Sequence, residues 1–118
     1  MNNKTCPFCQ IIAGQLPANI VYQDDSVIAF HDHTPIAPIH ILIVPKIHIP
    51  SLNEADADQQ ELLGSLLLVA QHIARQQGID QKGYRLVLNT GPDGGQSVFH
   101  LHLHFIAGRR FPMDMAIQ

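Results

Sequence analysis

Short apolar runs separated by polar turns predict five β-strands along this chain. β-Branched and aromatic residues are frequent in these runs, and such residues suit the pleated surface of a strand. The run Ile41-Leu42-Ile43-Val44 has no polar position, so its strand is expected to be buried on both faces. The predicted strands are residues 19–23, 27–30, 39–45, 84–89 and 98–107.

Two other segments have helical patterns. Residues 6–13 suit one or two helical turns before Gly14, and residues 54–77 suit one long helix that ends at Gly78. The long helix has an apolar face whose members recur at spacings of three and four residues. That face consists of Leu62, Leu63, Leu66, Leu67, Ala70, Ile73 and Ala74.

The start and the width of the long helix carry further predictions. Ser51 or Asn53 is placed to cap the first turn, where three acidic residues suit the positive end of the helix dipole. Leu68 and Val69 widen the apolar surface beyond one face, which indicates a buried partner. A second copy of the chain is the economical candidate for that partner.

Length and composition limit the class of protein. The chain has 118 residues, of which 46% are hydrophobic and 14% charged, so we expect one domain with its own core. The net charge of −3 and the lack of a Lys/Arg run argue against nucleic-acid binding, which depends on neutralising phosphates. The longest apolar stretch, residues 66–70, is too short to span a membrane. Without an apolar signal segment at the N-terminus, we expect a cytoplasmic protein with reduced Cys6 and Cys9.

Three of the eight histidines, His100, His102 and His104, stand at alternate positions in the last predicted strand. Alternate residues of a strand point to one face, and burying three imidazoles there is costly unless they bind something. One metal ion would find it hard to gather all three, because they span roughly 13 Å of strand. Nucleophilic catalysis suits the spacing better, since a neutral imidazole attacks phosphorus and leaves it again readily.

The loop before the histidines supports chemistry at phosphorus. Gly94 and Gly95 let backbone N–H groups approach an anion, and Ser97 adds a hydroxyl donor. A glycine-rich loop alone is more often only a turn. Joined directly to the histidine strand, this loop predicts a phosphate site beside a nucleophile.

The run His100-Leu101-His102-Leu103-His104-Phe105-Ile106 resembles the signature of the histidine triad family, His-x-His-x-His followed by two apolar residues. Further segments are similar to the nucleotide-binding branch of that family, so that the resemblance covers roughly residues 8–109. These segments are Asp24-Asp25, Ala29-Phe30-His31-Asp32, Ala37-Pro38-Ile39-His40, Val44-Pro45-Lys46, Gly83-Tyr84-Arg85 and Gly94-Gly95-Gln96-Ser97-Val98-Phe99.

The resemblance implies an α+β fold with a five-stranded antiparallel sheet, one long helix and a short N-terminal helix. It also implies a homodimer whose sheets join into one continuous ten-stranded sheet. On this basis residues 1–118 form a single histidine triad domain, with residues 1–5 and 111–118 as flexible tails.

The implied activity is hydrolysis of purine nucleoside phosphoramidates, in which AMP or GMP is joined to an amine, with no cofactor in the chemical step. His102 would form a nucleotidyl-histidine intermediate, and His104 would contact the phosphate or the leaving group. The implied catalytic residues are His102, His104, His100, His40 and Ser97. The implied nucleotide-binding residues are Phe8, Ile11, Phe30, Asp32, His33, Asn89, Gly95, Ser97, His102 and His104.

Two alternative functions stay open. A second branch of the superfamily cleaves dinucleoside polyphosphates, although it carries Gln where Asn89 stands here. Alternatively the chain binds nucleotides as a sensor or interaction protein, which the intact triad and Ser97 disfavour. His33 stands where relatives often have an apolar residue, which leaves the base preference open. Adenosine and guanosine are not distinguished, because an apolar base site accepts either purine. The tail after Arg110 does not match the branch, which leaves the amine undefined.

The pair in Cys6-Pro7-Phe8-Cys9 is absent from many relatives. As a redox motif it would need a thioredoxin-like βαβ setting, which the predicted elements do not provide. Some bacterial members of the family hold a structural zinc ion with such a pair and two histidines, and the matching positions here are His48 and His100. The other interpretation is two free thiols near the N-terminus.

Overall fold

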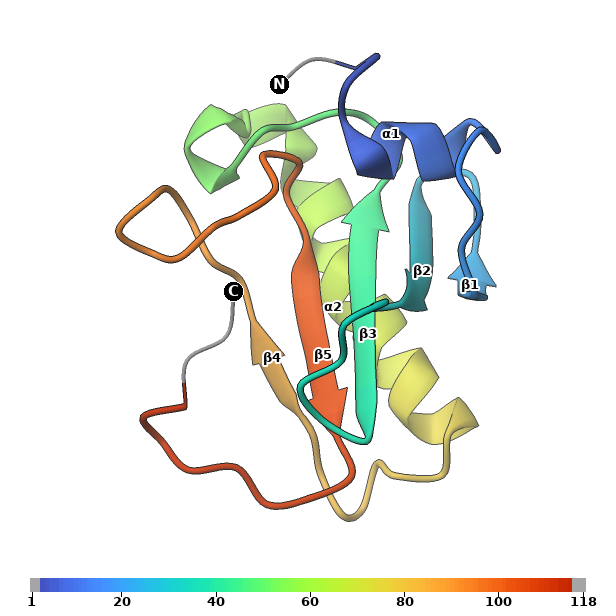
Figure 1. Cartoon of the computed structure of the whole chain (residues 1–118), viewed down its shortest axis with the longest axis vertical. Coiled ribbons are helices and arrows are strands. Elements are labelled where there is room, and N and C mark those ends of the chain that lie inside the picture. The colour runs from blue at the N-terminus through green and yellow to red at the C-terminus, as the bar shows by residue number, and fades with distance from the viewer. Residues whose placement is uncertain (1–2, 116–118) are drawn as a thin grey trace.

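The computed structural model describes residues 3–115 and contains a five-stranded antiparallel sheet (Figure 1). The strand order is β1-β2-β3-β5-β4. The strands are β1 (Ile20–Gln23), β2 (Val27–His31), β3 (Ile39–Pro45), β4 (Arg85–Val87) and β5 (Leu103–Ala107). The helices are the short α1 (Pro7–Ile12) and the long α2 (Gln60–Gln76). The expected α+β fold, with one long helix and a short N-terminal helix, is therefore confirmed.

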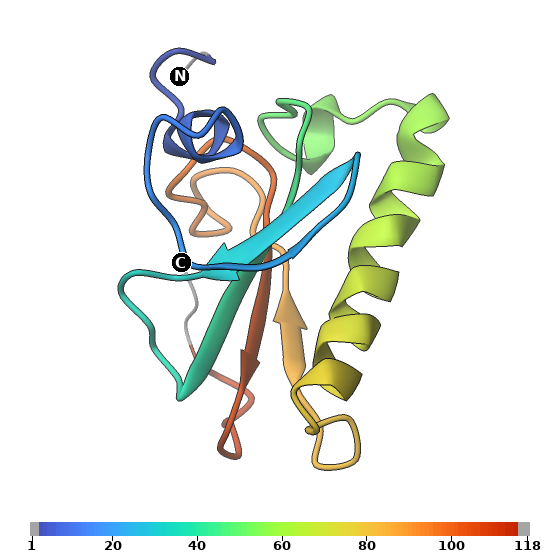
Figure 2. The same cartoon turned by 90° about the vertical axis from the view of Figure 1, so that its right-hand side faces the viewer.

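Different helices pack against the two faces of the sheet. Helix α2 runs along one face, as Figure 2 shows, and its fully buried Ile73 belongs to the same apolar cluster as Ile43 and Phe105. Helix α1 lies over one end of the opposite face, where Phe8 packs in a cluster with Phe30. Strand β3 supplies residues to both clusters, as its uninterrupted apolar run predicts. The face of the sheet opposite α2 is covered only in part, by α1.

The long helix begins six residues later than the pattern predicts. Residues 52–54 and 57–59 form two 3₁₀ turns, and between them Ala55 is extended with ψ of 139°. Ser51 does cap, but it caps the first 3₁₀ turn by accepting from the N–H of Asn53. The side chains of Asp56 and Gln59 form a capping box before α2 instead. The local caps therefore divide the predicted helix into three pieces.

The outer surface of α2 carries exposed leucines. Leu67 was expected on the packed face but is 54% exposed, and Leu68 is 65% exposed. Val69, by contrast, is buried against the sheet. The packed stripe is therefore rotated by part of a turn from the predicted one, and an apolar strip remains on the outside of the helix.

Strand β5 is half the length predicted, and of the three triad histidines only His104 lies within it. The ladder with β3 ends at the pair Ile43 and Leu103. Beyond that point the N–H of Leu101 donates to the carbonyl of Ile49 at 2.7 Å, outside the ladder. Pro45 at the end of β3 has no N–H for a sheet partner. Residues 98–102 therefore leave the sheet, and the prediction of a strand from residue 98 is wrong.

The other boundaries agree with the patterns to within two residues, as expected for frayed ends. The predicted flexible tails, residues 1–5 and 111–118, lie partly outside the described residues. Within the described part, the Arg85 guanidinium donates to the carbonyls of Phe111 and Pro112 at 3.1 and 2.7 Å. Among residues 3–115, neither helix combines the length and the apolarity that crossing a membrane requires.

Candidate active site and Cys/His cluster

A cavity of about 910 Å³ lies between α1, the β2–β3 connection and the histidine segment. Most of the residues that the sequence predicts for nucleotide binding and catalysis line it. These are Phe8, Ile11, Phe30, Asp32, His33, His40, Ser97, His102 and His104. Segments from both ends of the chain therefore meet in one concave site, as small-molecule sites require.

Some predictions fall outside this lining, and some lining residues were not predicted. Asn89, Gly95 and His100 do not line the cavity in the part of the chain that is described. The additional lining residues are Pro7, Leu16, Pro17, Ala18, Asn19, His31, Thr34, Ile36, Leu42 and Val98. They come mainly from the connections flanking β1 and β2, whose prolines and polar residues give no periodic signal. His31, which the sequence suggests is a surface residue, is exposed but lines the rim.

One end of the cavity is apolar and depends on α1. Pro7 begins this helix, and Cys6 caps it by accepting from the N–H of Cys9. The Phe8 ring then meets Phe30 edge to face, with centroids 5.6 Å apart, and meets His102 at 5.1 Å. Aromatic and aliphatic surface of this kind suits a flat purine base.

The hydrogen bond of His102 defines which of its nitrogens is nucleophilic. Its Nδ1 donates to the backbone carbonyl of His100 at 2.8 Å, because a carbonyl can only accept. The lone pair of the neutral ring is therefore on Nε2. Burial lowers the pKa of His102 below its ordinary value, against opposing effects of the His100 carbonyl and the Asp32 charge. The ring is thus held neutral, the form that acts as a nucleophile.

A second chain of hydrogen bonds orders His40 and His104. The backbone N–H of Ile36 donates to Nδ1 of His40 at 3.2 Å, so neutral His40 carries its proton on Nε2. That Nε2 lies 3.0 Å from Nδ1 of His104 and donates to it. The proton of neutral His104 then resides on Nε2. Burial lowers the pKa of His40, and the Asp32 carboxylate, 3.5 Å away, opposes this shift.

Gln96 holds the glycine-rich loop against the body of the domain. Its side-chain amide donates to the carbonyls of Pro50 and Val98 at 2.7 and 3.0 Å. Its Oε1 accepts from the N–H of Gly91 at 2.9 Å. A side chain on Gly94 would lie 2.4 Å from the Thr90 carbonyl oxygen, so the tight turn requires glycine there. This turn places Ser97 at the cavity wall. From the sequence, no role is predicted for Gln96, which is buried.

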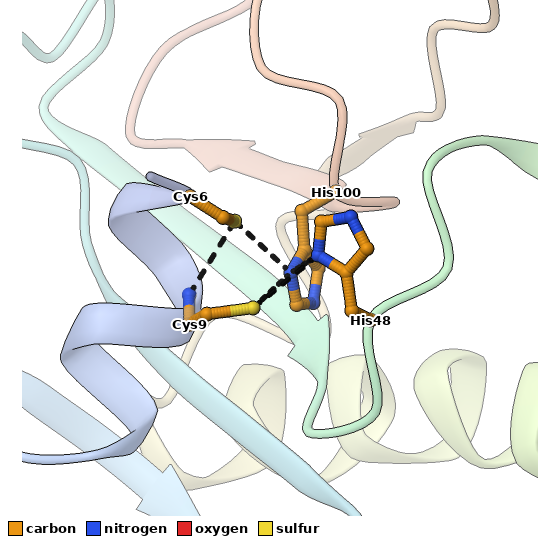
Figure 3. Close-up of side chains that lie close together, drawn as sticks. All are labelled: Cys6, Cys9, His48 and His100. Atoms are coloured by element: carbon orange, nitrogen blue, oxygen red, sulfur yellow. Dashed lines mark hydrogen bonds between the residues drawn. The ribbon is translucent and has the colours of Figure 1, made fainter. Parts of the chain in front are cut away.

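The four predicted metal ligands converge beneath α1 (Figure 3). The Cys6 and Cys9 sulfurs lie 3.4 and 3.5 Å from Nδ1 of His100, and the Cys9 sulfur lies 3.3 Å from Nδ1 of His48. The two Nδ1 atoms are 3.2 Å apart. We call these four residues the Cys/His cluster.

The hydrogen bonds and donor spacing of the Cys/His cluster fit a tetrahedral zinc ion. His100 Nε2 donates to the Pro45 carbonyl at 2.8 Å, which leaves the lone pair of Nδ1 directed into the cluster. Burial lowers the pKa of His100 to about 4, so this ring is neutral as a ligand must be. Ordinary Zn–S and Zn–N bond lengths in a tetrahedron place donor atoms about 3.4 to 3.8 Å apart. Four of the six observed separations are 3.2 to 3.5 Å, close to this range, and all four donor atoms lie within 4.8 Å of one another.

Comparisons with known proteins agree with this architecture. The family model described as the HIT domain matches residues 13–111. The purine nucleoside phosphoramidase of Escherichia coli K12 is 50% identical over 102 residues, which cover 86% of each chain. The structure of a HIT family hydrolase from Legionella pneumophila has a TM-score of 0.91 and 43% identity, covering 93% of this chain and 98% of that one. A histidine triad protein from Clostridium difficile also has a TM-score of 0.91, with 44% identity and coverage of 95% and 97%.

Proposed function

Because this chain belongs to the HIT domain family, we propose that it is a hydrolase of the P–N bond in purine nucleoside 5′-phosphoramidates. The observation that carries the proposal is the state of His102. Its ring is buried and neutral, its Nδ1 proton is held by the His100 carbonyl, and it lines a cavity with an apolar end. Such a ring presents Nε2 as a nucleophile to a bound phosphorus atom.

The reaction takes two displacements at phosphorus. In the first, Nε2 of His102 forms a bond to phosphorus, and the bond between phosphorus and the amine nitrogen breaks. The Ser97 hydroxyl, which lines the cavity, gives the leaving amine its proton. In the second, water attacks phosphorus, its proton passes to the Ser97 oxygen and restores the hydroxyl, the bond to Nε2 breaks, and the nucleoside monophosphate is released. One difficult displacement thereby becomes two easier ones.

The remaining predicted residues have supporting roles in this proposal. The Nε2–H of His104 donates a hydrogen bond to a phosphate oxygen, and His40 keeps His104 in that tautomer. His100 supports His102 through its carbonyl rather than by contact with substrate. Since all these groups are imidazoles, hydroxyls and backbone atoms, the chemical step needs no cofactor.

The nucleotide is proposed to bind with its base against Phe8, Ile11 and Phe30 and with its ribose hydroxyls on Asp32. One carboxylate oxygen of Asp32 already accepts from the N–H and the hydroxyl of Thr34. The other faces the His40 side and is the candidate acceptor for ribose. AMP and GMP both suit an apolar base site, and His33 lies where it can contact the base edge. Asn89 and Gly95 remain proposed phosphate contacts outside the described cavity lining.

We further propose that the Cys/His cluster holds one structural zinc ion, bound by Cys6, Cys9, His48 and His100. Zinc would fasten these segments together and would take no part in the displacements at phosphorus. Thiolate ligands require a reducing compartment, which agrees with the cytoplasmic location expected from the sequence.

A homodimer is also proposed, with the sheets of two copies joined into one ten-stranded sheet. Leu67 and Leu68, 54% and 65% exposed on the outside of α2, are apolar surface that a second copy would cover. Sedimentation equilibrium should give twice the chain mass of 13.1 kDa, and the double change of both leucines to Lys should shift the distribution toward the monomer. A wild-type protein that sediments as a monomer at micromolar concentration would contradict this proposal.

The reaction is tested by comparing two substrates under one set of conditions. An adenosine 5′-phosphoramidate should be hydrolysed at saturating concentration, with EDTA present, much faster than diadenosine polyphosphates. Turnover should persist in EDTA because imidazole and hydroxyl groups carry the chemical step. Preference for the polyphosphate would assign the chain to the other branch. Binding of AMP with no turnover of either substrate would leave a nucleotide-binding protein.

A further inference from the structure

Helix α1 belongs to two sites at once. Phe8 and Ile11, three residues apart, line the cavity. Cys6 and Cys9, also three residues apart, belong to the Cys/His cluster. Residues three apart lie near one another on a helix, so one six-residue segment presents one pair to the base site and another pair to the cluster. A movement of this helix therefore changes both sites together.

In the described part of the chain, α1 is attached to the rest of the domain mainly through its side chains. A helix of six residues is too short to be stable by itself. The backbone hydrogen bonds described for residues 6–16 join partners within that segment, for example Gln10 with Cys6 and Ala13 with Cys9. Attachment to the sheet consequently depends on apolar packing around Phe8 and on the two cysteine side chains.

The histidine half of the Cys/His cluster is well anchored. His100 donates from Nε2 to the carbonyl of Pro45 at the end of β3. The next residue, Leu101, donates its N–H to the carbonyl of Ile49, beside His48. The two segments that carry His48 and His100 are thus bonded to each other and to β3. They form a fixed frame on which α1 can be fastened (Figure 3).

We propose that zinc bound in the Cys/His cluster locks α1 onto this frame and thereby positions Phe8 and Ile11 for nucleoside binding. Cys6 and Cys9 are then positioning residues for the base site, although neither lines the cavity. This inference rests on the proposed function, because it takes the cavity to be a nucleotide site. It makes the structural metal a determinant of nucleotide affinity.

The positions of α1 and His102 predict different effects of zinc loss on KM and on kcat. Loss of zinc frees α1, so nucleotide binding weakens and KM rises. His102 keeps its bond to the backbone carbonyl of His100, because the bonds of His100 to Pro45 and of Leu101 to Ile49 hold that segment without zinc. We therefore expect KM for the phosphoramidate and Kd for AMP to rise about tenfold, while kcat changes by less than about twofold.

The first experiment compares the zinc-loaded wild type with the same protein after removal of zinc by a strong chelator and after zinc is restored. Elemental analysis should find one zinc per chain in the loaded protein. Amide hydrogen exchange of residues 8–12 should become at least about tenfold faster without zinc and return when zinc is restored, with β5 unchanged. AMP affinity, measured by calorimetry, should follow the same cycle.

Variants distinguish the effect of losing zinc from the effect of changing a residue of α1. Cys9→Ser should lose zinc and show the fast exchange and weak AMP binding of the zinc-free wild type. Cys9→His supplies another zinc ligand and should recover part of both properties. Gln10→Ala is the matched control, because Gln10 lies on α1 but neither lines the nucleotide cavity nor belongs to the Cys/His cluster, and its side chain bonds to the Lys4 carbonyl. This variant should retain the bound zinc, the slow amide exchange of α1 and the AMP affinity of the wild type.

Failure of this inference differs from failure of the proposed function. Apo protein that does not take up zinc, or zinc removal that leaves α1 exchange and AMP affinity unchanged, would overturn the inference even if phosphoramidate is hydrolysed. Zinc-dependent AMP affinity in a protein that hydrolyses no phosphoramidate would refute the proposed reaction and leave the lock supported.

Discussion

Replacement of His102 by Ala is expected to reduce phosphoramidate hydrolysis by about 10⁴-fold or more. The reason is that, in the proposed reaction, Nε2 of His102 forms the covalent bond to phosphorus and no other described group in the site replaces it. His40 and His104 hold each other through a hydrogen bond, and that bond commits Nδ1 of His104 as an acceptor. The cavity lining from Phe8, Phe30 and Asp32 is retained, so AMP binding should remain within about tenfold of wild type.

The measurement is single-turnover hydrolysis, quenched at alkaline pH because a P–N bond to histidine is labile in acid, with mass spectrometry to detect a nucleotidyl group on the protein. Wild type should carry this group transiently on the peptide that contains His102, and His102→Ala should not. His72→Ala is the matched control, since His72 lies on α2 against Tyr22, on the other side of the sheet from the cavity. An alanine variant that keeps more than about a tenth of the wild-type rate would exclude His102 as the nucleophile.

Replacement of Phe105 by Ala is expected to lower the free energy of unfolding by about 4 kcal/mol. Phe105 is completely buried on the α2 face of β5, and its ring stacks on Tyr84 with centroids 4.9 Å apart. Truncation removes the transfer free energy of the ring and leaves a cavity that helix and sheet cannot easily close. For a domain of this size, such a loss is a large part of the total stability.

Urea denaturation at one protein concentration measures this effect. Phe99→Ala makes the same chemical change six residues earlier, at a side chain that is only half-buried, and should cost clearly less. Phe105→Leu should recover more than half of the loss, because it refills most of the volume. Equal destabilisation by the Phe99 and Phe105 changes would show that burial on β5 does not control the stability of the domain.

Local patterns were sufficient for most of the fold. The apolar run of β3 predicted both its bounds, residues 39–45, and its burial on two faces. Alternation likewise separated Leu103 and Phe105, which face α2, from His104, which faces the cavity. These features were readable because side-chain period and β-propensity act over neighbouring residues. The signature His100-Leu101-His102-Leu103-His104-Phe105-Ile106 and its flanking segments are specific enough to indicate the family by themselves.

Other features depend on backbone partners and caps that the hydrophobic pattern does not report. Strand β5 begins at Leu103 because its ladder with β3 ends at that residue. Helix α2 starts late because local caps turn its first predicted residues into two 3₁₀ turns. The tautomer of His40 depends on the backbone N–H of Ile36, and any residue other than proline could have supplied that group. A backbone donor leaves no mark in a sequence pattern.

The sequence by itself therefore determined the candidate residues for the proposed chemistry: the three histidines, the glycine turn before them, the apolar residues proposed to contact the base and the cysteine pair. Only the tertiary structure decided how they are combined. It brings Cys6 and Cys9 against His48 and His100, some 40 to 90 residues away, and makes α1 part of both the cluster and the cavity. Periodicity reports the face on which a side chain lies, whereas the meeting of two faces is set by the packing of the whole chain.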